Sequence, residues 1–244
     1  MKRTLPICIA LLLVLTTACS PSGAASTSQA GSVSNAPAEP VQTTNPIPDQ
    51  AAKPLNQFAL DVTLDTQAHQ LKVKQTLTYY NHTGKPLSQI YFNLIPQAFQ
   101  QDGGGTVVEQ VSVDGKAGTL SQVKETVYAL NLPTDLKADQ STDIQMKYQV
   151  KIPNIQNRFG YQEKVYNLGN FIATPAVYGK DGWTVEPYVD IGDAFYTEIA
   201  DYDVTIHVPD GYTVASTGRE TTKGRYQAKQ VRDFAFCASD GYTV

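Results

Sequence analysis

The sequence predicts an all-β domain with sandwich- or saddle-like antiparallel sheets, about ten strands and one long ordered loop region. Three observations support this prediction. Apolar and polar residues alternate strictly over several segments, turn clusters separate those segments, and no long stretch has a convincing helical period. Strict alternation is typical of strands that have one face on a core and the other face in water.

The alternation begins at Phe58 and continues beyond the turn-like stretch 66–70. The clearest strand is 144–152, in which apolar residues alternate with polar or charged ones, and another strand covers 202–208 and stops at "PDG". Short helices are compatible with 96–101 and 189–196.

The middle stretch 159–188 differs because it is rich in aromatic residues and glycine and shows little alternation. It is predicted to be a long, structured loop region. Long ordered loops are often functional, and a binding loop is one interpretation. The alternative is a lid that covers one open end of the sandwich.

The amino terminus has the pattern of an export signal. Lys2 and Arg3 precede an apolar run that is too short for a mature membrane-spanning helix, and "TTAC" follows. We interpret 1–18 as a lipoprotein signal peptide, after which Cys19 becomes the acylated amino terminus. The alternative is an ordinary signal peptide that is cut nearby. The predicted location is extracytoplasmic, with a lipid anchor in the cell membrane.

Residues 19–57 are predicted to be a disordered tether, because they contain no aromatic residue and are dense in small and polar residues. A flexible coil of this length spans roughly 35 Å. The domain proper is therefore expected at 58–244. The net charge of −4 and the lack of a basic stripe argue against a nucleic-acid partner.

Three cysteines offer no disulfide framework. Cys8 leaves with the signal, Cys19 is acylated, and Cys237 stands alone in the apolar stretch "FAFCA". Cys237 is therefore interpreted as a small buried hydrophobic residue and not as a nucleophile.

No catalytic residue and no metal site are predicted in the chain. The "GxSxG" motif is absent, and none of the three histidines lies within four residues of another. His69 and His82 lie in or beside turns and are expected to be solvated. His207 lies on the polar face of its strand with Asp201 and Asp203, which together form an ordinary solvated set.

The densest acidic stretch is 186–203. Its carboxylates are Glu186, Asp190, Asp193, Glu198, Asp201 and Asp203. One interpretation is an edge that binds an amine or another cation, and the alternative is a loop-to-strand junction at which carboxylates face water. Glu186 differs from the other carboxylates, because Trp183 and Pro187 flank it. We therefore expect its side chain to be partly buried.

Several segments resemble a known family, in the same order along the chain. "GDAFYTEIADYDVTIHVPDGYTVASTGRE" (192–220) resembles the close of the N-terminal β-domain of aminopeptidase-N-type zinc peptidases, the gluzincin aminopeptidases. "VYGKDGWTVEPY" (177–188) and "VRDFAFCASD" (231–240) resemble bacterial lipoprotein members of that family. The resemblance covers nearly all of 58–244.

The resemblance implies a modular peptidase whose catalytic domain carries "GxMEN" and the zinc motif "HExxH". The N-terminal domain of such a peptidase contributes one residue that helps to hold the free amine of the substrate, and by position Glu186 takes that role. Neither motif occurs in this chain. The chain is therefore expected to be a C-terminally incomplete, non-catalytic front part, with zinc only in the missing catalytic domain.

The expected partners are the membrane, peptides and that catalytic domain. A second hypothesis is a free-standing cell-surface lipoprotein whose loop 159–188 binds a ligand or a protein. A third is a purely structural domain in an assembly.

Overall fold

The computed structural model describes residues 53–191 and 195–242. The predictions for the signal peptide 1–18, for Cys19 and for most of the tether lie outside the described residues, and so does Asp193. Within the described ranges the chain forms eighteen strands and one 3₁₀ helix. No helix in these ranges has the length and apolar character needed to cross a bilayer.

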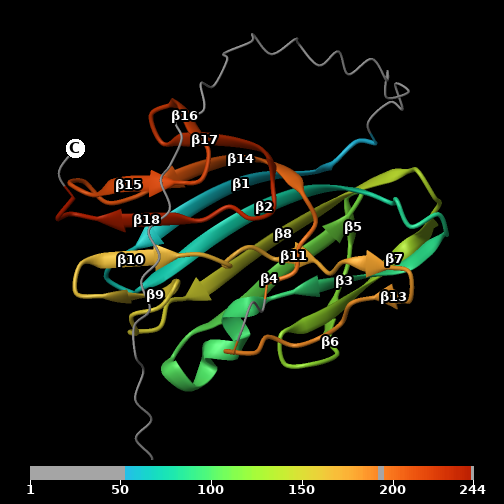
Figure 1. Ribbon diagram of the computed structural model, residues 1–244, viewed down its shortest axis with the longest axis horizontal. Helices are drawn as coiled ribbons and strands as arrows, with labels where there is room; N and C mark the ends of the chain where they lie inside the picture. Colours follow the sequence, from blue (N-terminus) through green and yellow to red (C-terminus); the bar gives the residue numbers. More distant parts are fainter. Residues whose placement is uncertain (1–52, 192–194, 243–244) are drawn as a thin grey trace, which may run out of the picture. The chain divides into compact units, whose positions relative to one another are not determined.

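The largest sheet has eight strands in the order β16-β17-β14-β1-β2-β8-β4-β5 (Figure 1). Its neighbours are antiparallel, as predicted, except that β1 and β14 run parallel. The strands are β1 (Asn56–Asp65), β2 (Gln70–Tyr80), β4 (Gly105–Val113), β5 (Lys116–Ala117), β8 (Ser141–Lys151), β14 (Ala200–His207), β16 (Arg219–Thr222) and β17 (Arg225–Val231). Asn56 and Gln57 thus belong to the first strand, although the sequence placed them at the end of the tether.

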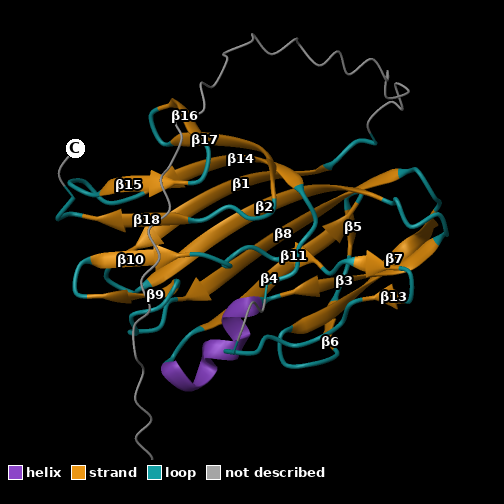
Figure 2. Cartoon of the chain, in the orientation of Figure 1, coloured by secondary structure: helices purple, strands orange, loops and turns teal. Residues whose placement is uncertain are grey.

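Three smaller sheets accompany the large one, and strands dominate the described chain (Figure 2). One has the order β15-β18-β10-β9, one has the order β11-β3-β7-β6, and β12 pairs with β13. Their strands are β3 (Leu87–Asn93), β6 (Leu120–Gln122), β7 (Val127–Leu136), β9 (Phe159–Gln162), β10 (Val165–Leu168), β11 (Thr174–Pro175), β12 (Tyr178–Gly179), β13 (Gly182–Trp183), β15 (Thr213–Ser216) and β18 (Phe236–Ser239).

The stretch 159–188 is ordered, and it contains five short strands, β9 to β13, joined by loops. These strands have two to four residues each, which is too few for alternation to be visible in the sequence. The 3₁₀ helix η1 (Ile95–Asp102) covers the expected helix at 96–101. The helix expected at 189–196 is not found in its described part, 189–191 and 195–196.

The alternating strands bury one face in a shared hydrophobic core. In β1 the side chains of Phe58, Leu60, Val62 and Leu64 are buried, and the residues between them are exposed or half-buried. Buried side chains of the smaller sheets, such as Phe236 of β18, belong to the same core cluster. Each large apolar side chain buried in this way contributes about 1.5–3 kcal/mol to folding.

A polar network crosses this core and holds a loop in place. Gln75 of β2, which is 2% exposed, donates from Nε2 to the carbonyl of Ala173 at 2.8 Å. The Tyr148 hydroxyl donates to Gln75 Oε1 at 2.8 Å and accepts from the Ala173 N–H at 3.4 Å. Burial raises the pKa of Tyr148, so it stays neutral and keeps its donor. The network fixes the backbone at Ala173 to the large sheet.

Candidate functional site

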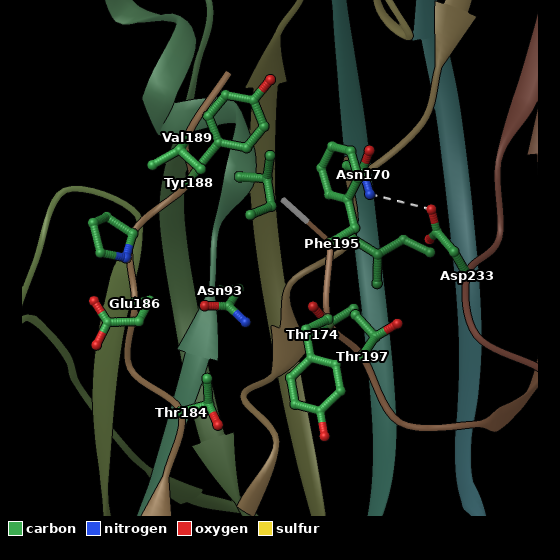
Figure 3. A pocket seen from close by; sticks show the side chains of 14 residues that line it. Asn93, Asn170, Thr174, Thr184, Glu186, Tyr188, Val189, Phe195, Thr197 and Asp233 are labelled. Atoms are coloured by element: carbon green, nitrogen blue, oxygen red, sulfur yellow. Dashed lines mark hydrogen bonds between the residues drawn. The ribbon is translucent and has the colours of Figure 1, made fainter. Parts of the chain in front are cut away.

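A pocket of about 240 Å³ lies in the described structure (Figure 3). Its lining combines two carboxylates with amides, threonine hydroxyls and an aromatic wall. The lining residues are Asn93, Ile95, Asn170, Ile172, Thr174, Thr184, Glu186, Pro187, Tyr188, Val189, Phe195, Tyr196, Thr197 and Asp233. A concave, partly apolar site with a few convergent polar groups is the usual form of a ligand-binding pocket.

Separate chain segments build the pocket, which explains why no single motif marks it. Asn93 ends β3, Asp233 lies between β17 and β18, and the residues 195–197 lead into β14. The loop 170–173 runs from β10 to β11. Gln75 and Tyr148 of the large sheet hold it through hydrogen bonds to the backbone of Ala173. The core of the domain therefore sets the shape of one wall.

Asp233 is the half-buried carboxylate of the pocket. Its Oδ2 accepts a hydrogen bond from Asn170 Nδ2 at 3.2 Å, and its Oδ1 accepts from the Phe234 N–H at 2.8 Å. Burial raises the pKa of Asp233 to about 6, although the Phe234 N–H and the charge of Arg158 pull it the other way. A cation that binds beside a desolvated carboxylate stabilises its charged form and lowers its pKa.

An aromatic wall adjoins Asp233. The Phe195 and Tyr188 ring centroids are 5.7 Å apart, and Tyr188 also lies 5.5 Å from Phe99. The Arg158 guanidinium sits 4.5 Å from the Phe195 ring centroid, within the range of a cation–π contact. The pocket therefore offers apolar surface next to a carboxylate.

Glu186, the predicted amine-binding residue, lines the same pocket on the side away from Asp233 (Figure 3). The prediction that it is partly buried is wrong, because its side chain is 75% exposed. Its flanking Trp183 packs instead against Tyr178 and Tyr91, at ring distances of 5.2 and 5.7 Å. Glu186 Oε2 accepts a hydrogen bond from Lys124 Nζ at 3.2 Å, which already balances its charge.

The other described carboxylates of the acidic stretch do not join this pocket. Glu198 accepts from Asn56 Nδ2 at 3.2 Å, and burial raises its pKa. Asp201 accepts from the Gln230 N–H at 2.9 Å. Asp203 pairs with Arg225, with Oδ2 2.6 Å from Nη2. Asp201 and Asp203 thus join β14 to β17. With Glu198 they do not form one cation-binding edge.

The histidines lie apart from one another, and His69 and His82 are less solvated than expected. His207 lies 3.2 Å from Asp61 Oδ2 and is exposed, as predicted. His69 is not simply solvated, because Tyr161 stacks on it at 3.9 Å and its Nδ1 lies 2.7 Å from the Tyr166 hydroxyl. His82 is half-buried, with Nε2 2.6 Å from the Pro54 carbonyl.

Within 53–191 and 195–242, no three His, Cys, Asp or Glu side chains gather closely enough to hold a metal ion. These residues therefore supply no ligand set that fits zinc. Cys237 is half-buried and donates from Sγ to Asn167 Oδ1 at 3.3 Å. Burial raises the pKa of its thiol, which lowers the share of the reactive thiolate.

Asp233 is the site residue that the sequence analysis missed. Its signal was weak, since it is one charged residue between the strand 225–231 and the apolar stretch "FAFCA". The residue that orients it, Asn170, is 63 positions away along the chain. Only the fold brings these two side chains together.

The raised pKa of Asp233 leads to a stability prediction. A carboxyl group whose pKa is about 6 in the folded protein, above its usual 3.8, destabilises the fold above about pH 6, and this penalty disappears as the pH falls towards 4. Asp233→Asn is therefore expected to raise the free energy of unfolding by about 2 kcal/mol near neutral pH. Urea unfolding of both proteins at several pH values measures this. A gain that persists at about pH 4 would contradict the assignment of this pKa.

No protein-family model matches the sequence, and neither does any curated protein. Solved structures are similar to part of the chain. The M1 zinc metallopeptidase of Deinococcus radiodurans is 17% identical with a TM-score of 0.49, and the match covers 76% of this chain and 42% of that chain. A two-domain M1 zinc metallopeptidase mutant bound to L-tryptophan is 18% identical with a TM-score of 0.49 and has the same coverage.

An aminopeptidase N family protein from Idiomarina loihiensis is 15% identical with a TM-score of 0.44. That match covers 75% of this chain and 29% of the other. The chain thus spans less than half the length of these solved structures.

Proposed function

We propose that the pocket between Glu186 and Asp233 binds the protonated amino terminus of a peptide, and that the domain does this as the N-terminal domain of a zinc aminopeptidase. The observation that carries the proposal is the half-buried carboxylate of Asp233, whose pKa is raised to about 6 in a pocket with an aromatic wall. A perturbed carboxylate in a cleft is a typical functional group.

The chemistry of the pocket suits an ammonium group attached to an apolar side chain. Asp233 provides the negative charge, and the Asn170 amide fixes the direction of one carboxylate oxygen. Tyr188 and Phe195 provide apolar surface for the first side chain of the peptide. Glu186 is the secondary group, because Lys124 competes for its charge.

The surface beside the pocket supports a neighbouring domain. Val189, Ile191 and Tyr196 are 55%, 84% and 60% exposed, and Val189 and Tyr196 also line the pocket. Exposed apolar side chains that gather at one place often mark an interaction site. In the proposed function this surface packs against the catalytic domain, which supplies the zinc and completes the substrate site.

In this proposal the protein acts outside the cytoplasm, and a lipid on Cys19 holds it at the membrane. This part of the proposal rests on the sequence pattern of 1–19. A Cys19→Ser variant is expected to move from the membrane fraction to the soluble fraction. Retention of the variant in the membrane fraction would contradict the lipid anchor.

The coding sequence beyond the Val244 codon tests the aminopeptidase part of the proposal. "GxMEN" and "HExxH" are expected there in one forward frame. The polypeptide that contains them is expected to release amino-terminal residues from peptides and to stop doing so with a zinc chelator. A stop codon with neither motif in any frame would overturn this part, and the pocket would then belong to a cell-surface lipoprotein that binds amines.

A further inference from the structure

A second hollow, of about 300 Å³, lies on the outer face of the large sheet, over β1, β2, β8 and β4. Lysines dominate its charged lining. Lys72 and Lys74 project from β2 and Lys147 from β8, and all three are exposed. Asp61 and Glu109 line its sides. It is separate from the pocket between Glu186 and Asp233 (the amine pocket), because the two hollows share no lining residue.

Two of these lysines face each other directly. Lys74 and Lys147 are paired positions in the antiparallel ladder of β2 and β8. Directly opposed side chains in such a ladder have Cβ atoms about 5 Å apart, and like charges at these positions destabilise the sheet. Neither lysine has an ion-pair partner within the part of the chain that the structure describes. The fold therefore places a like-charge pair in the hollow, with Asp61 of β1 opposite Lys74 on its other side.

The two carboxylates that line the hollow have other polar partners, although Asp61 also lies directly opposite Lys74 in the ladder of β1 and β2. Asp61 lies 3.2 Å from His207 Nε2. Glu109 occupies a bulge of β4, where the register with β8 shifts, and it accepts a hydrogen bond from Gln149. Lys72 is the least isolated of the three lysines, since its charge helps to lower the pKa of Asp65 after the hydrogen bond from the Ala68 N–H. With three lysines against two carboxylates, the lining of the hollow keeps an excess of positive charge.

We propose that this hollow binds a phosphate monoester group through Lys74 and Lys147, with Lys72 at its edge. Lysines bind phosphate as compact point charges, whereas planar recognition of a carboxylate favours arginine, and this hollow contains no arginine. A phosphate dianion neutralises two ammonium groups at once and removes the repulsion between them. The group belongs either to a small phosphorylated molecule or to a phospholipid headgroup.

The test uses the 244-residue chain at low ionic strength, because salt screens exposed charges. Glycerol 3-phosphate is titrated, and binding is followed by calorimetry and by the rise in Tm. Phosphatidic acid vesicles, whose headgroup is a phosphate monoester, are compared with phosphatidylcholine vesicles to distinguish a lipid headgroup from the small molecule as the source. The variant is Lys74→Gln with Lys147→Gln. The control is Lys151→Gln, which removes a lysine from the exposed face of β8 outside the hollow.

The proposal expects saturable binding of glycerol 3-phosphate or of the anionic vesicles by the parent chain. Binding should weaken at least about tenfold in the double variant and change little in the control. Binding that survives in the double variant, or a parent chain that binds neither probe, would overturn the proposal.

Discussion

Asp233→Asn is expected to weaken the binding of a free peptide amine by about ten- to a hundredfold near neutral pH. The variant keeps the shape of the side chain, and its one amide oxygen can still accept from the Phe234 N–H. Its Nδ2 then faces Asn170, whose amide must turn its oxygen towards it to keep a hydrogen bond, and the negative charge is gone. An ammonium group in a partly desolvated pocket then has no nearby counter-ion, since Glu186 is exposed and paired with Lys124. Calorimetric titration of both proteins with the same peptide amide measures the change.

The matched control for this prediction is Asp181→Asn, which removes an exposed carboxylate outside the pocket. It should leave the affinity unchanged, and Glu186→Gln should reduce it less than Asp233→Asn does. The affinity of the parent chain should also fall as the pH drops through about 6, because Asp233 then takes up a proton and loses its charge. The same pH dependence in Asp233→Asn would show that another group binds the amine.

Gln75→Leu is expected to lower the free energy of unfolding by about 2–4 kcal/mol. Leucine fills much of the space but leaves the Tyr148 hydroxyl and the Ala173 carbonyl without their partner at 2.8 Å. Both groups are buried, so water cannot replace the lost hydrogen bonds cheaply. Urea unfolding, followed by tyrosine fluorescence or circular dichroism, measures the loss.

The same variant should also affect the amine pocket, because Ile172 and Thr174 line it on either side of Ala173. The expected result is weaker peptide binding together with the lower stability. Gln145→Leu is the control, since Gln145 lies on the exposed face of β8. If Gln75→Leu and Gln145→Leu change stability equally, the buried network does not hold the loop as inferred.

The sequence predicts the long strands well because their period is visible over many residues. The strands β1, β8 and β14 alternate between buried and solvent-facing side chains along their whole length. The short strands β11, β12 and β13 have two residues each, which is too few to show a period. β11 pairs with the distant β3, whereas β12 and β13 pair with each other. The parallel pairing of β1 with β14 joins segments at the two ends of the domain, which local pattern does not encode.

The site is harder to predict than the fold, because contacts between residues distant in the sequence decide which side chains are buried in it. The sequence identified Glu186 from its position, and the structure places it in the pocket, but its aromatic neighbour Trp183 turns away towards Tyr178. Local aromatic neighbours therefore did not imply burial. His69 shows the converse, because a residue in a turn is covered by Tyr161 from a different sheet.

A calorimetric titration of the 244-residue chain with a peptide amide, repeated with the same peptide acetylated at its amino terminus, tests the proposed amine site most directly. Acetylation removes the positive charge and leaves the side chains unchanged, so it isolates the contribution of the ammonium group. We expect saturable binding of the free amine, no measurable binding of the acetylated peptide, and loss of binding in Asp233→Asn. Equal binding of the two peptides, or no binding of either, would contradict the assignment of this pocket to peptide amino termini.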